Sequence, residues 1–159
     1  PHLCLPYSFS SHFSPDMLDE ALHIYRRDFK PSAQLQQPYT MAGFNIFAAD
    51  TQEEAELIAT SAMQTVVALR TGTPGRLQPP LPGYRDTLPP MAQSMLANFF
   101  AASSIGTQEQ VERDLAAFIR RTRVDEVIVS GFIYDADARK RSAEIGMAAM
   151  KAIEAEVTA

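Results

Sequence analysis

The sequence predicts an α/β fold built around a parallel sheet. Three short apolar segments are predicted as strands, and two of them lack the regular polar alternation of a strand with one wet face. Stretches with apolar residues at helical spacing follow the strands. Such alternation implies right-handed crossovers between parallel strands, in either an open doubly wound sheet or part of a (β/α)8 barrel. Three strands cannot close a barrel alone.

The first strand and helix are predicted near the N-terminus. Residues 5–13 form a short apolar run that ends in the polar residues Ser10, Ser11 and His12. Ser14 and Pro15 then suit the first positions of a helix. Apolar residues recur at helical spacing through Leu18, Ala21, Leu22, Tyr25 and Phe29.

The second predicted strand and the helix after it have the clearest sequence pattern. Residues 39–49 are aromatic, β-branched or small almost throughout, which is typical of a strand buried on both faces. Thr51 and Glu54 match a capping box at a helix N-terminus. The helix is predicted to bury one apolar stripe, made of Ala55, Ile58, Ala62, Val66 and Leu69.

Residues 71–90 hold six prolines and three glycines, which rule out a regular helix or strand. This proline-rich segment is predicted to be an irregular excursion, either a lid over an active site or a disordered loop. A short apolar helix is expected after it, over about residues 91–100.

The last part of the chain repeats the helix–strand pattern. Thr107 and Gln110 match a second capping box, and basic residues near 120–123 suit the last turn of that helix. Residues 126–134 are predicted as a third buried strand. Asp135 can cap a final amphipathic helix, and a ligand contact is the alternative role for it.

Composition excludes several classes of protein. A net charge of −5 offers no basic field for nucleic acid, and no apolar run reaches the roughly 20 residues of a membrane span. The N-terminus lacks a signal-peptide pattern, and the one cysteine, Cys4, excludes an internal disulfide, so the cytoplasm is the predicted compartment. The three histidines lack ligand-like spacing, which predicts no metal site. Because Pro1 opens the chain and apolar residues follow at once, we expect the chain to start inside a structural element.

Ligands of parallel α/β folds bind at the C-terminal ends of the strands. These ends are residues 10–13, 45–50 and 130–135, and none contains a recognised catalytic motif. His12 is placed to donate a proton or a hydrogen bond, with a purely structural role as the alternative. Asn45 in an apolar strand requires a partner for its amide, from either a neighbouring strand or a ligand.

Four ordered segments make the chain resemble a known family. They read LPYSFSSHFSPDML, FKPSAQL, PYTMAGFNIFAADTQEEA and VDEVIVSGFIYDADARKRSAE, and together they extend from about Leu5 to Glu144. In order and spacing they are similar to the C-terminal half of bacterial luciferase-like monooxygenases. The resemblance implies that residues 1–159 are the C-terminal portion of a (β/α)8 barrel, with strands six to eight and their helices, and that the first five strands are absent.

The resemblance also implies an activity. Luciferase-like enzymes use reduced FMN, supplied by a separate flavin reductase, and O2 to oxygenate a small organic substrate such as an aldehyde. A deazaflavin-dependent oxidoreductase is one alternative. A catalytically incomplete α/β fragment that acts as an association module is another. The absence of the first five strands is expected to leave apolar surface uncovered. Such a surface predicts a homo-oligomer, most simply a dimer, or a complex with the missing N-terminal half.

The expected site residues lie at the strand ends, and the resemblance places Ser10, Ser11 and His12 beside the flavin ring or its substrate pocket. His12 is expected to be catalytic, Ser10, Ser11 and Asn45 to contact the cofactor, and Phe13, Phe132 and Asp135 to line the substrate pocket. The last strand departs from the family pattern. Relatives often carry Tyr-Asp-His where this chain has Tyr134, Asp135 and Ala136, which puts any role of that histidine in doubt.

Overall fold

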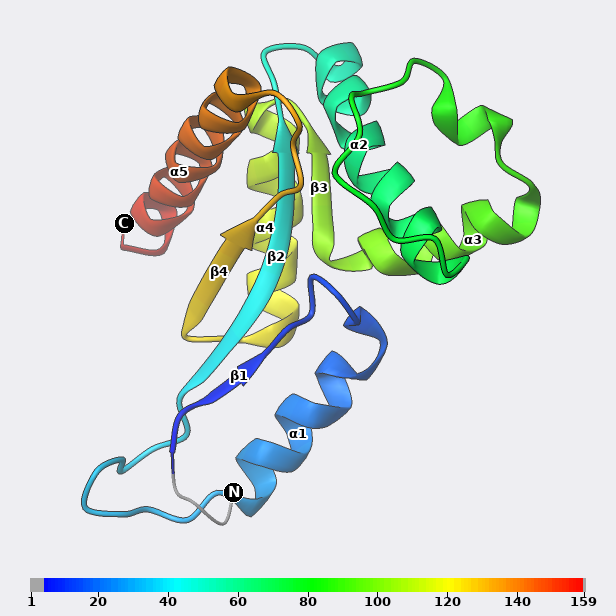
Figure 1. Ribbon diagram of the computed structural model, residues 1–159. Coiled ribbons are helices and arrows are strands. Elements are labelled where there is room, and N and C mark those ends of the chain that lie inside the picture. Colours follow the sequence, from blue (N-terminus) through cyan, green and yellow to red (C-terminus); the bar gives the residue numbers. More distant parts are fainter. Residues whose placement is uncertain (1–4, 159) are drawn as a thin grey trace.

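The computed structural model describes residues 5–158, with side chains described as far as residue 155, so Cys4 lies outside the described part. Four strands alternate with five helices in these residues (Figure 1). In chain order the elements are β1 (Tyr7–Phe9), α1 (Leu18–Asp28), β2 (Thr40–Ala48), α2 (Gln52–Arg70), α3 (Pro90–Phe99), β3 (Ser103–Gly106), α4 (Gln108–Thr122), β4 (Glu126–Ser130) and α5 (Ala136–Thr158). Short 3-10 turns cover Pro15–Met17, Tyr84–Thr87 and Phe100–Ala102.

The long strand β2 is the centre of a parallel sheet. β4 pairs with one edge of β2, from Met41 to Asn45. The other edge is shared, because β1 pairs with the first residues of β2 and β3 with the last four. The first half of β2 therefore lies between β1 and β4, and its end lies beside β3. β1 ends beside Ala42, and the turn after β1 then meets the middle of the central strand.

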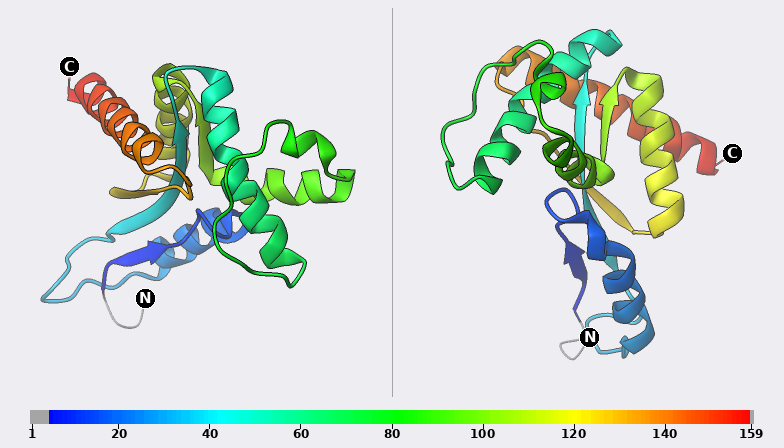
Figure 2. Two further views of the ribbon diagram at one scale, coloured as in Figure 1. Left: turned by 45° about the horizontal axis from the view of Figure 1, so that its top comes forward. Right: turned by 90° about the vertical axis from the view of Figure 1, so that its right-hand side faces the viewer.

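Two apolar cores lie on opposite faces of β2, because successive strand residues point to opposite sides. The even-numbered residues from Ala42 to Ala48 pack against α1, α4 and α5. On the other face Phe47 packs against α2, Leu96 of α3 and Ile133. The right-hand view of Figure 2 shows α1 and α4 on one side of β2, and α2 with the proline-rich segment on the other.

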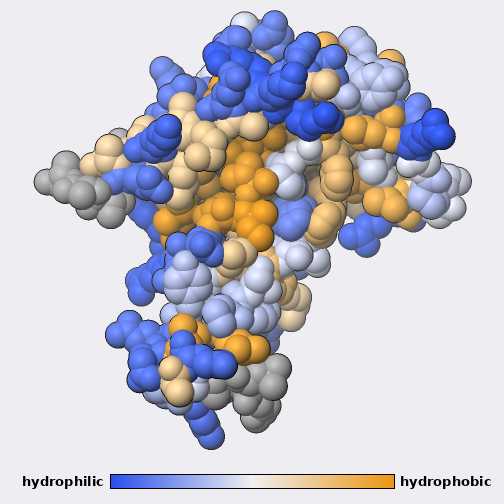
Figure 3. Space-filling model, turned by 60° about the vertical axis from the view of Figure 1, so that its left-hand side comes forward, coloured by the Kyte–Doolittle hydropathy of each residue, from blue (hydrophilic) through white to orange (hydrophobic). Residues whose placement is uncertain are grey.

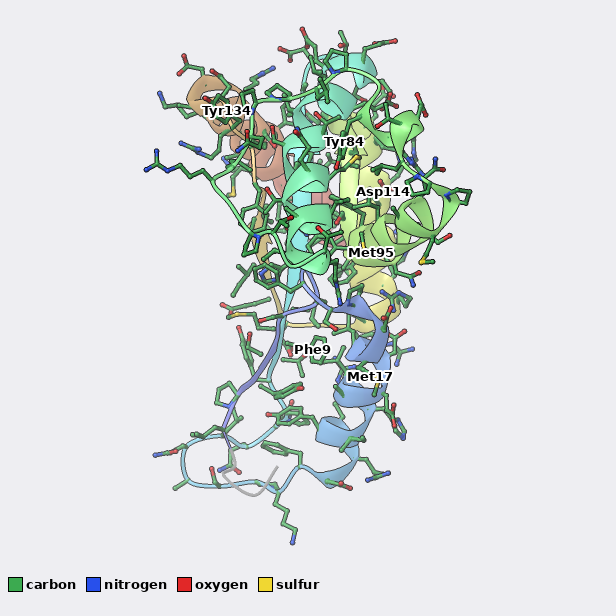
Figure 4. All side chains as sticks on the ribbon, turned by 45° about the vertical axis from the view of Figure 1, so that its right-hand side comes forward. Phe9, Met17, Tyr84, Met95, Asp114 and Tyr134 are labelled. Carbon is green, nitrogen blue, oxygen red and sulfur yellow. The ribbon has the colours of Figure 1, made fainter. Side chains whose placement is uncertain are left out.

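The proline-rich segment runs alongside α2. Gln64 donates a hydrogen bond to the Pro79 carbonyl over 2.8 Å, and the Leu81 amide donates to the Thr60 hydroxyl over 2.9 Å. Tyr84 packs against the same core as Met95 of α3, and in Figure 4 both side chains lie near α2. These contacts give the segment a defined path, and its role as a lid stays a prediction.

Several sequence expectations are confirmed. β2 and α2 occupy the predicted residues, and the Thr51 hydroxyl accepts the Glu54 amide at 3.2 Å as a capping box requires. α3 follows the proline-rich segment, and the Asp135 carboxylate caps α5 through the amides of Asp137 and Ala138. The chain also has no helix among its described residues that is long and apolar enough to cross a membrane.

Two local expectations are wrong. Ser14 makes no side-chain cap hydrogen bond, and α1 begins only at Leu18, after the 3-10 turn that starts at Pro15. Leu69, predicted in the buried stripe of α2, is 59% exposed.

Three further expectations are wrong. The strand β3 was not predicted, because Ser103–Gly106 is short and half serine, and only its pairing with β2 makes it a strand. The second capping box is absent: the Thr107 side chain makes no cap hydrogen bond, and Gln110 donates to Asp114 instead. The strand predicted over residues 126–134 ends at Ser130 and is not buried.

β4 is a half-exposed strand with one paired edge. Ile128 and Val129 point to opposite faces, yet they are 46% and 44% exposed. Figure 3 shows an apolar area on this side of the molecule, between α5 and the lobe formed by β1 and α1. Val127 packs against the first core, but the second edge of β4 pairs with no strand among the described residues and presents a surface for further pairing.

One buried hydroxyl links α5 to the central strand. Ser142 accepts the Ala48 amide at 3.0 Å and lies 3.2 Å from the Ile46 carbonyl, to which it donates. We expect Ser142→Ala to lower the free energy of unfolding by about 1–3 kcal/mol, because both backbone groups lose a buried partner. Urea unfolding measures the change, with the exposed Ser94→Ala as the control. Equal effects of the two substitutions would contradict this prediction.

Candidate functional site

The turn after β1 is folded back onto the middle of β2. The Ser11 amide donates to the Phe9 carbonyl, and the Phe13 amide donates to the Ser10 carbonyl over 3.0 Å. The Ser11 side chain is fully buried, and its hydroxyl donates to the Gly43 carbonyl over 2.6 Å. The turn is therefore held both by its own backbone and by β2.

His12 packs directly on the backbone of Gly43. A Cβ atom at position 43 would overlap Nδ1 and lie 2.6 Å from Cε1 and 2.8 Å from Cγ of the imidazole. Only glycine leaves room for the ring here. The edge made by Cγ, Nδ1 and Cε1 thus faces the strand, and the opposite edge, which carries Nε2, faces away from Gly43.

Burial keeps the His12 imidazole neutral near pH 7. Nδ1 is buried without a hydrogen-bond partner, and desolvation lowers the pKa of His12 below its ordinary value of 6.5. A neutral ring retains one N–H donor and one acceptor nitrogen. With Nδ1 against the strand, Nε2 is the nitrogen that can meet a ligand.

This burial predicts a pH dependence. The unfolded chain protonates His12 near pH 6.5 and the folded chain only at lower pH, so the unfolded state binds more protons between these values. We expect stability to fall as the pH drops below about 6.5, and His12→Gln to weaken that fall. An NMR titration of the imidazole checks the cause directly, and a midpoint at or above 6.5 would contradict it.

Asn45 connects the ends of β1, β3 and β4. Its side chain is 1% exposed, and its Nδ2 donates to the His12 carbonyl at 2.9 Å and to the Ser103 hydroxyl at 3.4 Å. The Ser130 hydroxyl donates to Oδ1 of Asn45 over 2.8 Å. Ser103 and Ser130 are the residues paired with Asn45 in the neighbouring strands. Neighbouring strands and the turn after β1 therefore supply the partners that the amide requires.

An aromatic wall stands beside His12. The ring centroids of His12 and Phe13 are 4.2 Å apart, and those of Phe13 and Phe132 are 6.1 Å apart. Phe13 is 48% exposed and Phe132 37% exposed, so both offer apolar ring surface to a ligand. The two phenylalanine rings are tilted by 43° to each other, so they offer an angled apolar surface next to the outward imidazole nitrogen, against which an aromatic ligand with a polar edge can pack.

Comparison with known proteins identifies relatives of the chain. No family model matches it. A protein of Escherichia coli strain K12 named luciferase-like monooxygenase is 43% identical over 145 residues, which are 91% of this chain and 43% of that protein. The chain is a homologue of luciferase-like monooxygenases. The uncharacterized protein YvbT of Bacillus subtilis strain 168 is 38% identical over 90% of the chain.

The fold of this luciferase-like chain also matches a solved structure. The crystal structure of apo-MsnO8 superposes with a TM-score of 0.82 at 23% identity, over 94% of this chain and 46% of that one. The match confirms the α/β fold with its parallel sheet. The chain spans less than half the length of the relatives and of the solved chain that it matches.

The structure brings five of the seven predicted site residues of the luciferase-like chain together. Ser11, His12, Phe13, Asn45 and Phe132 form the region described above. Ser10 is exposed at the edge of the same turn. Asp135 is committed to capping α5. The polar atoms of Ser11 and Asn45 bond to protein groups, so direct contact of either with a cofactor stays a prediction.

Three contributing residues were missed. Gly43, Ser103 and Ser130 hold no reactive group, and their roles depend on pairing across the sheet. An isolated glycine within a buried strand is a known sign of close backbone approach, and it could have pointed to Gly43. Ser130 opens the strand end 130–135 that the sequence already indicates, whereas no comparable signal marks Ser103.

Other parts of the described chain offer less. A cavity of about 620 Å³ lies between α2 and the turn at Tyr84–Thr87, and it contains none of the predicted site residues. No group of three or more His, Cys, Asp or Glu side chains within the described residues is arranged to hold a metal ion. The region around His12 remains the candidate site.

Proposed function

We propose that this chain provides the last three strand–helix units of a (β/α)8 barrel in an FMN-dependent monooxygenase. The parallel neighbours β1, β2 and β4 correspond to strands six, seven and eight, with α1, α4 and α5 packed on one face of β2. The homologues named luciferase-like monooxygenase are more than twice as long as the matched part. Their remaining length is enough for the other five units.

The open strand β4 supports this proposal. Parallel strands are almost always covered on both faces, because crossover helices pack against them. The first strands of a barrel would pair with the free edge of β4 and cover Ile128 and Val129. The exposed faces of Phe13 and Phe132 would then line the barrel mouth, where ligands of this fold bind.

The residues present fit a flavin. Its isoalloxazine ring is aromatic with a polar edge, so it could pack against the ring of Phe13 or Phe132 with that edge near the outward nitrogen of His12. When bound, reduced FMN supplies the reaction with O2 that oxygenates an organic substrate. Once the missing strands covered them, the two phenylalanines would exclude water from that reaction, and the exposed Ser10 hydroxyl would be available to a polar group of the cofactor or substrate.

His12 is the group that we expect to act on the ligand. A neutral imidazole with Nδ1 against the strand can donate a hydrogen bond through Nε2–H, or accept one after the tautomer changes. Ser11 and Asn45 hold the turn that carries it. The arrangement of His12 on Gly43, beside the aromatic wall, is the observation that carries the proposal.

The proposed partners follow from this chemistry. A flavin reductase would supply reduced FMN, and the small organic substrate and O2 would enter the same mouth. A deazaflavin would offer a similar flat ring, so a deazaflavin oxidoreductase is the second cofactor hypothesis. A different hypothesis is that the chain acts only as an association module, which the half-exposed β4 favours, with a homodimer as the simplest product.

The test begins with the protein isolated from its source, whose intact mass is compared with 17.5 kDa. A longer protein that binds FMN and consumes O2 with reduced FMN and a saturated aldehyde would support the proposal. Flavin binding without any dependence on O2 would overturn the monooxygenase assignment and favour the oxidoreductase. A species of 17.5 kDa that self-associates without binding FMN would favour the association module.

A further inference from the structure

We propose that Gly43 and Asn45 are positioning residues that seat the His12 imidazole on β2 and direct its Nε2 toward the ligand. The inference rests on the proposed function, because that function requires Nε2 of His12 to face the ligand. Neither residue offers a reactive group. Each acts on the position of His12, Gly43 through the ring and Asn45 through the backbone.

Gly43 determines how close the ring comes to the strand. The imidazole occupies the space in which any other residue at position 43 would place its Cβ. The ring cannot retreat sideways without cost, because Phe13 stands 4.2 Å away on one side. A methyl group at position 43 must therefore push the ring away from β2 and expose Nδ1.

Asn45 determines where the backbone of His12 lies. Its amide nitrogen donates to the His12 carbonyl, and its amide oxygen accepts the Ser130 hydroxyl, so the side chain cannot rotate without losing both. The strand position two residues from Gly43 places this amide on the same face of β2 as the ring. Gly43 therefore fixes the position of the His12 side chain, and Asn45 fixes the position of the His12 carbonyl.

The Ser11 hydroxyl completes the attachment. It donates to the Gly43 carbonyl, which binds the turn to the same strand residue that receives the ring. Three consecutive contacts therefore join residues 11 and 12 to residues 43 and 45. These contacts hold the carbonyl of His12 and the Nδ1 edge of its ring, and they leave Nε2 as the unconstrained end of the imidazole.

The first measurement follows the His12 ring nitrogens by NMR, without flavin. Gly43→Ala is expected to shift both nitrogen resonances of His12 and to raise the midpoint of its titration, because the ring becomes more exposed. Ser130→Ala, which removes one partner of Asn45, is expected to produce a smaller shift in the same direction. It serves as the second variant if Gly43→Ala fails to fold. Gly75→Ala is the matched control, because nothing lies within 4 Å of that position.

The second measurement uses FMN-dependent turnover of the full protein. We expect Gly43→Ala to lower kcat at least about ten-fold, since displacing a reacting group by about 1 Å can cost 10²-fold. In a His12→Ala background, the same change should have no further effect on kcat. Gly75→Ala should leave the imidazole resonances unchanged.

Two results would overturn the inference. Unchanged His12 resonances in folded Gly43→Ala and Ser130→Ala would show that these residues do not seat the ring. An equal loss of kcat from Gly43→Ala with and without His12 would show a structural effect that bypasses the imidazole. Failure of the proposed function is distinguishable from both, because the unmodified protein would then show no FMN-dependent turnover while the resonance shifts persisted.

Discussion

Phe47→Ala is expected to lower the free energy of unfolding by about 3–5 kcal/mol, the largest effect of any single substitution considered for this chain. Phe47 is fully buried on β2 and makes an edge-on contact with Phe100 at 5.6 Å. It is the sheet residue of the core that holds α2 and α3. Removing its ring leaves a cavity between β2 and these helices, and urea unfolding followed by circular dichroism measures the loss.

Phe13→Ala is the matched control for this prediction. It deletes the same ring from a position that is 48% exposed, so we expect a loss of at most about 1 kcal/mol. The variant should instead weaken FMN binding by the full protein, because Phe13 forms half of the aromatic wall. Similar losses of stability in the two variants would show that Phe47 is not the support of a core.

Arg26→Ala is expected to lower the free energy of unfolding by about 2–3 kcal/mol. The Arg26 guanidinium donates to the carbonyls of Thr122 and Arg123 at the end of α4, and to the Thr40 hydroxyl over 3.1 Å. Hydrogen bonds from a charged donor are stronger than neutral ones, and a cation also favours a helix C-terminus. Loss of this side chain should loosen α1 from the sheet and from α4.

Arg27→Ala is the control for Arg26. Arg27 is exposed and pairs with its neighbour Asp28 at 2.7 Å, and exposed pairs of this kind contribute little. We expect a change within about 0.5 kcal/mol. Thermal unfolding of both variants, at low and at moderate salt, tests the contrast. A change for Arg27→Ala as large as that for Arg26→Ala would refute the assignment of the network to Arg26.

The local pattern of the sequence was enough to predict the elements whose signals lie within the element itself. The central strand β2 and helix α2 were predicted because a continuous apolar run and a capping box do not depend on distant residues. Asp135 was placed correctly as an N-cap for the same reason. The resemblance carried by four ordered segments likewise pointed to the family that the relatives support.

The predictions for β3 and β4 failed because neighbouring strands determine the pairing and the burial of these two strands. β3 is a strand only because β2 offers its edge, and four residues rich in serine have little strand preference of their own. β4 has the composition of a buried strand, yet its exposure depends on which other strands are present to cover it. Neither condition is visible in a short window of sequence.

The sequence by itself determined the order of the main strands and helices, and it indicated the strand ends at which a site is expected and His12 as the candidate reactive group. Only the tertiary structure decided that the imidazole ring packs on Gly43. It also decided that the polar side-chain atoms of Asn45 and Ser11 form hydrogen bonds that hold the turn carrying His12. The physical reason is distance along the chain. These contacts join residues about 30 positions apart, and they exist only after parallel pairing has brought the end of β1 to the middle of β2.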